Sequence, residues 1–478
     1  MAKIELDLFT DLDMYLYIES AIRGGVSLVG KRYSKANNPY LSQTYDNSKP
    51  HSYIVIIDSN NLYGLSMVQY LPYSEFRWLR QSEIDEFNVK NVSSESEIGY
   101  ILEVDLEYPV SLHNLHNDLP LAVNHEKVEF EDLSTYQKSL LSSLNLKFNS
   151  NIKKLVPTLK DKSHYITYYE NLKFYLEKGL IFKKIHRILS FKQAPYLSPY
   201  IFFNNEKRKA SKSEFDKNFF KLMNNSFYGK CMQNVRKQIN LKAGLNKDQC
   251  KKYLNDPALE NFQIINEDCA VFRLKRSNLL LNKPLYIGFC VLESSKLHMY
   301  KTYYNVFKNY YKNNVNLLYT DTDSLILEIF TNDIYLDFKN NLPDIFDFSN
   351  YPLDHPLYSE KNKNKLGFFK DEAKSKVISE FVGLKAKMYS ISGEYYEKKT
   401  AKGINKSVVK STFYHDLYKS TLLKKQQHRH SQSQIISKNH VITTQFQNKI
   451  SLSAFYDKKY ILSNGIDTLS YGHYSISS

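Results

Sequence analysis

The sequence predicts an α+β fold built around an antiparallel sheet. Residues 315–329 read Val-Asn-Leu-Leu-Tyr-Thr-Asp-Thr-Asp-Ser-Leu-Ile-Leu-Glu-Ile, two apolar runs separated by a short polar turn. This pattern is typical of an antiparallel hairpin. A third apolar run, residues 53–57, ends at Asp58. Segments 217–230 and 288–312 instead show apolar and aromatic residues at the spacing of a helix, so strands and helices are both expected.

Other elements are expected in chain order around these. Strands should continue to about residue 80, and residues 81–195 mix strand patterns with a loop at 109–120 and a short helix closed by Gly179. Two helices joined near 211–213 are expected between Pro199 and about Arg236. Residues 237–283 are polar with scattered apolar runs. The stretch 424–434, rich in Gln and Ser, predicts an exposed linker that contains His428 and His430.

Carboxylates gather at the ends of the predicted strands. Asp321 and Asp323 share one tight turn, where like charges repel unless a cation or a proton compensates them. Asp58 supplies a third carboxylate from a remote strand. Magnesium favours oxygen ligands from one or two carboxylates together with substrate phosphates, so the pattern indicates phosphoryl transfer with two ions. Each aspartate alone would more simply be a turn or cap residue.

A polar stripe lies on the predicted helix 217–230. At about 100° per residue, one face carries cations, an amide, a ring and bare backbone. Its members are Lys217, Lys221, Asn225, Tyr228 and Gly229. Such a face suits a nucleoside triphosphate, with lysine meeting the phosphates as a point charge. The alternative for this segment alone is a solvated basic helix with core aromatics.

Composition favours a polyanionic partner. The 478 residues carry a net charge of +15, which attracts nucleic acid by counterion release and would also attract anionic membranes. There is no run of about 18 apolar residues and no N-terminal signal pattern, so neither a membrane span nor secretion is expected. Four cysteines without a C-x-x-C pair argue against a zinc site and favour reduced thiols in an intracellular protein.

Three of these segments, in this order, resemble motifs A, B and C of family B DNA polymerases. They are Asp58-Ser-Asn-Asn-Leu-Tyr63-Gly64, Lys221-x-x-x-Asn225-Ser226-x-Tyr228-Gly229 and Tyr319-Thr-Asp321-Thr-Asp323-Ser324. Further matches are similar to the protein-primed branch, which includes polymerases of viruses, linear plasmids and Polinton/Maverick transposons. They are Ile22-Arg23-Gly24-Gly25, which resembles Y-x-G-G, Lys387-Met388-Tyr389, which resembles K-x-Y, and the phrases 35–38, 367–372 and 469–474.

The resemblance implies a right-hand polymerase with palm, helical fingers and thumb. Its expected parts are a first palm part (1–80), an insertion between motifs A and B (81–195), fingers (196–236), a second insertion (237–283), a second palm part (284–400) and a thumb (401–478). The implied activity is that of a DNA-directed DNA polymerase, a nucleotidyltransferase, which replicates a viral or transposon-like element. Expected partners are primer-template DNA, deoxynucleoside triphosphates and a terminal protein as a source of the priming hydroxyl. A monomer is expected.

The resemblance also implies residue roles. Asp58, Asp321 and Asp323 would be catalytic and hold two Mg²⁺ ions, which Mn²⁺ could replace. Lys221 would hold the triphosphate, Tyr63 would exclude a 2′-hydroxyl, and Lys217, Asn225, Tyr228 and Gly229 would line the nucleotide pocket. DNA contacts would come from Arg23, Gly24 and Gly25 on the template side and from Lys387, Tyr389 and Lys402.

Three features depart from the family pattern. Gly64 replaces the usual proline of motif A, and Ile22 replaces the tyrosine of Y-x-G-G. Only 57 residues precede Asp58, too few for the proofreading exonuclease of the family, so no proofreading is expected and the chain looks truncated. Asp105-Leu-Glu107 matches a short nuclease pattern, but its alternation of apolar and acidic residues favours a half-exposed strand.

Two rival functions remain open. The first is a catalytically silent DNA-binding remnant of a mobile element, which would keep the net positive charge but have no polymerase activity. An RNA-templated polymerase is disfavoured because reverse transcriptases place two adjacent aspartates after their tyrosine, whereas Thr322 separates them here.

Overall fold

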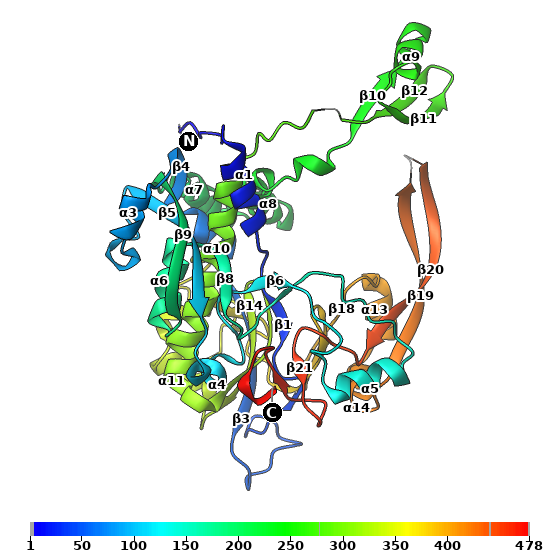
Figure 1. Ribbon diagram of the computed structural model, residues 1–478. Helices are drawn as coiled ribbons and strands as arrows, with labels where there is room; N and C mark the ends of the chain where they lie inside the picture. Colours follow the sequence, from blue (N-terminus) through cyan, green and yellow to red (C-terminus); the bar gives the residue numbers. More distant parts are fainter. Residues whose placement is uncertain (1–3, 277, 439–440, 477–478) are drawn as a thin grey trace.

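The computed structural model describes residues 4–276, 278–438 and 441–476. It contains helices and sheets, and every pair of named strands in the described part of the chain is antiparallel. The α+β class with an antiparallel sheet is therefore confirmed (Figure 1).

A nine-stranded sheet forms the centre of the described structure, in the order β1-β13-β14-β3-β16-β17-β18, with β15 beside β3 and β2 beside β16. Its strands are β1 (Ser27–Val29), β2 (Tyr33–Lys35), β3 (Ser52–Ser59), β13 (Val315–Asp321), β14 (Ser324–Phe330), β15 (Phe369–Asp371), β16 (Ile378–Lys385), β17 (Met388–Gly393) and β18 (Tyr396–Ala401). The β13–β14 hairpin turns at Thr322 and Asp323, with Thr322 at φ +64°, as the predicted tight turn requires. Strand β3 lies directly beside β14, although more than 260 residues separate them in the chain.

The two faces of this sheet pack against different parts of the chain. Ile57, Leu317 and Leu327 belong to the large core, whereas Ile56 and Ile326 belong to a second core that contains Tyr456 of the C-terminal segment. This alternation follows from the two-residue period of strands. A bulge between Leu317 and Tyr319 interrupts it and turns Tyr319 to the second face.

Helix α10 (Leu285–Lys301) is buried along almost its whole length and organises the large core. It contacts α1 (Leu12–Ala21), α2 (Leu62–Met67), α6 (Tyr169–Glu177) and α8 (Glu214–Cys231). A π-helical segment, Thr302–Lys308, and α11 (Asn309–Tyr311) extend it. The predicted helix at 288–312 is confirmed, and burial on all sides explains its mixed apolar and small residues.

A second sheet lies beside the first and orders its strands β4-β9-β5-β8. Its strands are β4 (Leu71–Trp78), β5 (Ile98–Glu107), β8 (Lys162–Tyr168) and β9 (Ile181–Ala194). Helix α6 follows β8 and ends before Gly179, whose φ of +97° suits the chain reversal. Shorter elements complete residues 81–168: α3 (Gln81–Asp85), α4 (His113–His116), β6 (Asn124–Glu126), α5 (Thr135–Ser143) and β7 (Lys154–Val156).

Two packed helices follow, α7 (Ser198–Ala210) and α8, and they confirm the helical segments predicted on either side of 211–213. Pro199 lies in the first turn of α7, and the Ser213 hydroxyl caps α8 by accepting a hydrogen bond from the Asp216 N–H.

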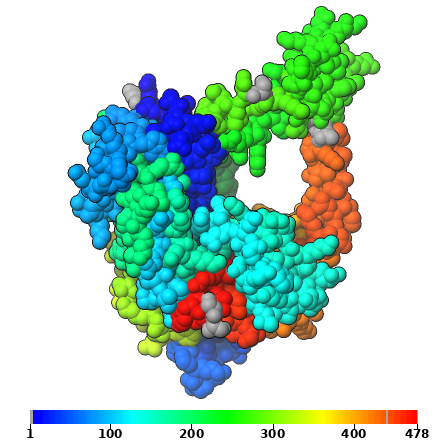
Figure 2. All heavy atoms as spheres, in the orientation of Figure 1, coloured from blue at the N-terminus to red at the C-terminus, as the bar shows by residue number. Residues whose placement is uncertain are grey.

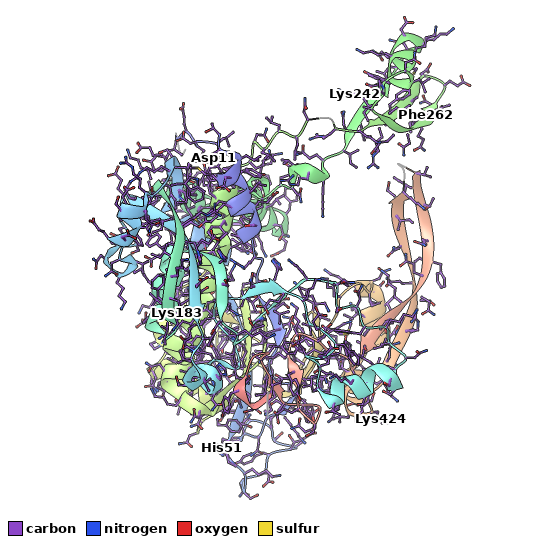
Figure 3. All side chains as sticks on the ribbon, viewed as in Figure 1. Asp11, His51, Lys183, Lys242, Phe262 and Lys424 are labelled. Carbon is purple, nitrogen blue, oxygen red and sulfur yellow. The ribbon has the colours of Figure 1, made fainter. Side chains whose placement is uncertain are left out.

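A small sheet stands apart from the body beyond α8. It comprises β10 (Asn240–Gly244), β11 (Leu259–Asn266) and β12 (Cys269–Leu274), with α9 (Lys247–Leu254). Figure 1 shows it above the β19–β20 hairpin, and Figure 3 shows Lys242 and Phe262 on it, far from Asp11 in the body.

The C-terminal part contains α13 (Lys406–Thr412), α14 (His415–Leu423), β19 (Gln427–Lys438), β20 (Val441–Ser453), β21 (Tyr460–Ile461) and β22 (Thr468–Leu469). The predicted linker at 424–434 is wrong, because β19 and β20 pair in a long hairpin that includes His428 and His430. Both faces of most of this two-stranded hairpin are solvated, so polar residues suffice and no apolar alternation marks it. Figure 2 shows an opening bounded by this hairpin, the β10–β12 sheet and the body.

Short helices fill the remaining loops: η1 (Val89–Asn91), η2 (Val110–Leu112), η3 (Val235–Lys237), η5 (Lys312–Asn314), α12 (Ile334–Asn340), η6 (Pro343–Ile345) and η7 (Tyr474–Ile476). Within the described ranges, none of the helices combines the length and apolar character needed to cross a bilayer.

Candidate active site

Strand pairing brings Asp58 and Asp323 together from opposite parts of the chain. Asp58, near the end of β3, lies directly opposite Ser324, the first residue of β14. Asp323 immediately precedes Ser324 in the turn, and its carbonyl accepts a hydrogen bond of 2.8 Å from the Ser59 N–H. The two carboxylates predicted to share a cation are therefore neighbours.

Burial and mutual repulsion disfavour the ionised form of this pair. Burial raises the pKa of Asp58 to about 7, and the charges of Asp323 and Glu372 add to the shift. Burial also raises the pKa of Asp323, and the Asp321 carboxylate contributes in the same direction. Lys221 opposes both shifts. The negative charge of these two desolvated carboxylates is poorly balanced by nearby cations, which makes the pair suitable for binding a divalent cation.

Asp321 lies on the same face of the sheet but has its own partners. It pairs with Ser324 across the hairpin and with Ser27 of β1. The Lys387 ammonium lies 3.1 Å from Asp321 Oδ1, and the Tyr319 hydroxyl donates to Asp321 Oδ2 at 3.3 Å. In residues 4–276, 278–438 and 441–476, no three His, Cys, Asp or Glu side chains are grouped so as to hold a metal alone. Asp58 and Asp323 thus form a pair of carboxylates with Asp321 nearby, and the three do not form a complete metal site by themselves.

Two tyrosines close one side of the carboxylate pair. The Tyr63 and Tyr228 rings stack with centroids 4.7 Å apart and planes inclined by 24°. Burial raises the pKa of Tyr63, and Asp323 is the largest neighbouring charge that acts on its hydroxyl. Tyr63 and Tyr228, each predicted to contact the nucleotide, are therefore in contact with each other near Asp323.

The structure gives a local reason for glycine at position 64, where the motif that this segment resembles has proline. Asn61 caps α2 from the left-handed region, at φ +46°, and its Oδ1 accepts a hydrogen bond of 3.3 Å from the Gly64 N–H. Proline has no N–H to donate. An added Cβ at Gly64 would also lie 2.2 Å from Asn61 Nδ2. With Asn61 in this position, residue 64 needs both an N–H and no Cβ, and glycine meets both conditions.

The residues of helix α8 that were predicted to bind the nucleotide differ in their position relative to the carboxylates. Lys221 acts electrostatically on Asp58 and Asp323, and Gly229 faces open space. Asn225 is half-buried one turn before Gly229. Lys217 instead forms an ion pair of 2.8 Å with Glu214 at the surface, so the structure does not bring it to the carboxylates.

The segment before β1 divides into a buried arginine and two glycines. Arg23 is only 4% exposed, and its guanidinium donates to the carbonyls of Ala21 and Ile166 and to Asn124 Oδ1. Its side chain therefore cannot reach a phosphate in this conformation, contrary to the sequence prediction. Gly25 packs on the hairpin turn, where an added Cβ would lie 2.3 Å from Thr322 Oγ1, whereas Gly24 faces open space.

The turn between β16 and β17 meets the carboxylate site from another side. Lys387, at φ +60°, donates its N–H to the Tyr319 hydroxyl at 3.0 Å, and the Tyr389 ring packs on the Tyr319 ring at 4.6 Å. The Lys402 N–H donates to the Lys387 carbonyl at 2.9 Å, and its side chain is exposed. The predicted residues Lys387, Tyr389 and Lys402 thus lie together, linked to Asp321 through Tyr319.

Sequence reasoning missed two charged neighbours of Asp58. Strand β15 pairs with the end of β3, which brings Glu372 close enough to raise the pKa of Asp58 further. Lys398 of β18 pairs with Glu372 at 3.3 Å and acts in the opposite direction. The only sequence signal was that Glu372 ends the phrase 367–372; nothing local marked Lys398.

Asp105 and Glu107 lie on β5, as the alternation predicted. Asp105 Oδ2 lies 2.8 Å from His186 Nε2 of β9, and Glu107 forms an ion pair with Lys183 of the same strand. These cross-strand partners account for both carboxylates as part of the second sheet.

Comparison with solved structures shows the same overall arrangement. The chain is similar to Phi29 DNA polymerase in complex with primer-template DNA (TM-score 0.54), to its ternary complex with primer-template DNA and incoming nucleotides (0.52) and to an orthorhombic crystal form (0.51). Each is 14% identical, and the matches cover 94%, 95% and 94% of this chain. The chain spans 64% of the length of each of these polymerase chains. Neither a protein-family model nor a curated protein matches the sequence. This likeness, together with the antiparallel sheet and its flanking helices, shows the α+β fold of a right-hand polymerase.

Proposed function

We propose that this chain is a DNA-directed DNA polymerase that extends a primer 3′-hydroxyl by phosphoryl transfer assisted by two metal ions. The observation that carries the proposal is the desolvated Asp58–Asp323 pair, set between the Tyr63–Tyr228 stack and the Lys387–Tyr389 turn on a polymerase fold. The solved relatives bind primer-template DNA and incoming nucleotides, and this proposal extends those partners to the present chain.

Asp58 and Asp323 would hold the cations together with the phosphates of the nucleotide, with Asp321 as their neighbour. When bound, Mg²⁺ ions supply activation of the 3′-hydroxyl and neutralisation of the charge that develops on the triphosphate. The protein contributes the Asp58 and Asp323 carboxylates, and a bound cation would relieve the repulsion between them. Mn²⁺ would serve in the same place.

The nucleotide would lie between the carboxylates and helix α8. Lys221 already acts on both carboxylates and would meet the triphosphate, while Asn225 and Gly229 would line its path. Tyr63 would lie under the sugar, where its ring leaves no room for a 2′-hydroxyl. Lys217 would need to leave Glu214 to take part.

The DNA would pass from the Lys387–Tyr389 turn toward the opening shown in Figure 2. Gly24, Gly25 and Lys402 would contact its backbone. The β10–β12 sheet and the β19–β20 hairpin would enclose it, in the roles of the second insertion and the thumb. Replication of a viral or transposon-like element, priming by a terminal protein, an intracellular setting and a monomeric state belong to the same proposal.

Primer extension tests the proposal. The purified chain with a 5′-labelled primer-template, four deoxynucleoside triphosphates and Mg²⁺ is expected to lengthen the primer, and EDTA is expected to stop it. Asp323→Ala should abolish extension and leave primer-template binding largely intact, because it removes one of the two paired carboxylates. Asp354→Ala, at an exposed loop position, is the matched control. Extension by Asp323→Ala at near the parental rate would disprove the assignment.

A catalytically silent DNA-binding protein is the competing function, favoured only by the net charge. It predicts tight primer-template binding with no extension in either Mg²⁺ or Mn²⁺. The same assay separates the two.

A further inference from the structure

Two serines in the sequence follow a pair of basic residues, with one residue between the pair and the serine. The two segments are Lys31-Arg32-Tyr33-Ser34 and Arg208-Lys209-Ala210-Ser211. Protein kinases with an acidic substrate groove select their serines by this pattern of charge. The sequence therefore offers two segments with the same charge pattern, and the structure has to distinguish them.

The fold distinguishes the two serines by their exposure. Ser34 lies on β2, is 3% exposed and donates its hydroxyl to Glu328 Oε1 at 2.7 Å, and Arg32 is completely buried. Ser211 instead is partly exposed in the segment 211–213 that joins α7 to α8, where Lys212 is exposed. Of the two serines, only Ser211 can enter the cleft of a kinase while the protein stays folded.

The backbone at Ser211 already has an extended conformation. Its φ of −70° and ψ of 130° follow the end of α7 at Ala210. Its hydroxyl donates to the Lys207 carbonyl at 2.7 Å, and its N–H donates to the Arg208 carbonyl at 3.3 Å. These two bonds hold the last turn of α7, and a terminal turn opens at little cost in free energy. Residues 208–212 can therefore become extended without disturbing the rest of α7.

Arg208 is close enough to hold a phosphate on Ser211, because residues three apart on a helical turn are neighbours. In the described part of the chain the Arg208 guanidinium makes neither a hydrogen bond nor an ion pair. Burial lowers its pKa, and the charge of Glu214 opposes this shift. Arginine binds phosphate through two parallel hydrogen bonds. A phosphate on Ser211 would thus supply the anion that this half-buried cation lacks.

We propose that Ser211 is a phosphorylation site for a protein kinase that selects basic segments, and that its phosphate weakens the binding of the incoming nucleotide. In the transfer, Ser211 Oγ forms a bond to the γ-phosphorus of ATP as the bond from that phosphorus to the β–γ bridging oxygen breaks. ADP leaves, and the hydroxyl proton passes to a carboxylate of the kinase. The phosphate adds a charge of about −1.5 to −2 at pH 7.

The new charge would lie just before the start of α8, the helix that carries Lys221. Lys221 is about 10 Å along α8 from Glu214, its first residue. A dianion there repels a triphosphate and competes with it for the cations of α8 and of the last turn of α7. The Debye length is about 30 Å at 0.01 M salt and about 8 Å at 0.15 M, so the effect should be clear only at low salt. This effect rests on the proposed function, whereas phosphorylation of Ser211 does not.

Phosphate transfer to the purified chain tests the site. The chain would be incubated with Mg-ATP and the catalytic subunit of cyclic-AMP-dependent protein kinase, and phosphopeptides would be located by mass spectrometry. The expected result is phosphate on Ser211 in the parent, its loss in Ser211→Ala and several-fold slower transfer in Arg208→Gln. Ser34 should stay unmodified. Absence of phosphate from Ser211, or transfer to Ser34 at the same rate, would overturn the proposal.

Nucleotide binding then measures the consequence without catalysis. A dideoxy-terminated primer-template and a base-labelled deoxynucleoside triphosphate would be bound to the phosphorylated and the untreated chain, and fluorescence anisotropy would give the nucleotide Kd. The phosphate should raise this Kd about 3-fold at about 20 mM salt, and the two values should converge at about 200 mM. Kinase-treated Ser211→Ala, the matched control, should keep the Kd of the untreated chain. Equal Kd values for the two forms at low salt would refute the assigned effect. A chain that shows this shift but does not extend primers would contradict the proposed function alone.

Discussion

At the residue scale, the site combines groups that are unfavourable in isolation. Asp58 is a partly buried carboxylate whose strongest charged neighbour is another carboxylate, Asp323. The structure offers Lys221 and Lys398 as partial compensation, and neither forms an ion pair with Asp58. Such an arrangement lowers the stability of the metal-free protein, and under the proposed function a bound cation would relieve the repulsion.

Asp58→Asn is therefore expected to stabilise the metal-free protein. The folded-state pKa of Asp58 is raised to about 7 from 3.8, so its stabilising protonation is complete below about pH 4 and is lost as pH rises toward 7. At pH 8 the free energy of unfolding of the variant should be higher than that of the parent by on the order of 1–3 kcal/mol. Near pH 4 the two proteins should have about the same free energy of unfolding. Thermal unfolding in EDTA across this pH range measures the difference. A variant less stable than the parent at pH 8 would contradict the assigned repulsion.

Tyr63→Ala addresses sugar selection at the same scale. The variant removes the ring that stacks on Tyr228, and the proposal places the incoming sugar above this ring. Under the proposed function, the ratio of ribonucleotide to deoxynucleotide incorporation should rise by about 10-fold or more, corresponding to roughly 1.4 kcal/mol. Single-nucleotide extension with each substrate measures it, and Tyr70→Ala, at a tyrosine outside the stack, is the control. An unchanged ratio would rule out a steric role for Tyr63.

At the element scale, one bulge decides which side chains face the site. In a regular strand Tyr319 and Asp321 would share the face of Leu317 and point into the large core. The bulge after Leu317 turns both to the face of Asp58. The Tyr319 hydroxyl can then connect Asp321 to the Lys387 turn.

The contact between Gly25 and the β13–β14 turn gives a prediction at this scale. Gly25→Ala is expected to destabilise the protein by about 1–3 kcal/mol, because the new methyl group would overlap the Thr322 side chain. Gly24→Ala, which meets open space, should cost much less. Thr322→Gly in the same chain as Gly25→Ala should restore part of the loss, since Thr322 has a positive φ that glycine adopts freely. Chemical denaturation of the four proteins measures these values, and equal losses for the two glycines would refute the packing argument.

At the scale of the whole molecule, two peripheral elements reach toward each other beyond the sheet. The β10–β12 sheet and the β19–β20 hairpin bound the opening in Figure 2 and carry exposed apolar side chains. These include Ile264, Ile265, Ile435, Ile442 and Phe446. Neither element lines the carboxylate site, so both can change without altering it.

Under the proposed function, removal of the small sheet is expected to weaken the retention of DNA without slowing the addition of a nucleotide. Asn240 and Leu274 are direct partners across β10 and β12, so a short Gly-Ser link in place of residues 240–274 closes the gap. The shortened chain should keep its melting temperature and extend a primer by one nucleotide at the parental rate. On a long template with a trap for free enzyme, its products should be several-fold shorter. Unchanged product length would show that this sheet does not help to retain DNA.

Local patterns predicted the parts of this protein that local physics determines. Apolar runs with a polar turn predicted β3, β13 and β14 and thereby the ends that carry Asp58, Asp321 and Asp323. Helical spacing predicted α8 and α10. Order along the chain then suggested the fold that the solved structures confirm.

Tertiary structure alone decided which of these side chains are available and what lies beside them. It buried Arg23 in the body, paired Lys217 with Glu214, formed a hairpin from residues expected to be a linker, and brought Glu372 and Lys458 to the carboxylates. Sequence patterns report the period and polarity of one segment at a time. Burial, strand register and ion pairing depend on contacts between segments hundreds of residues apart, and no local pattern contains them.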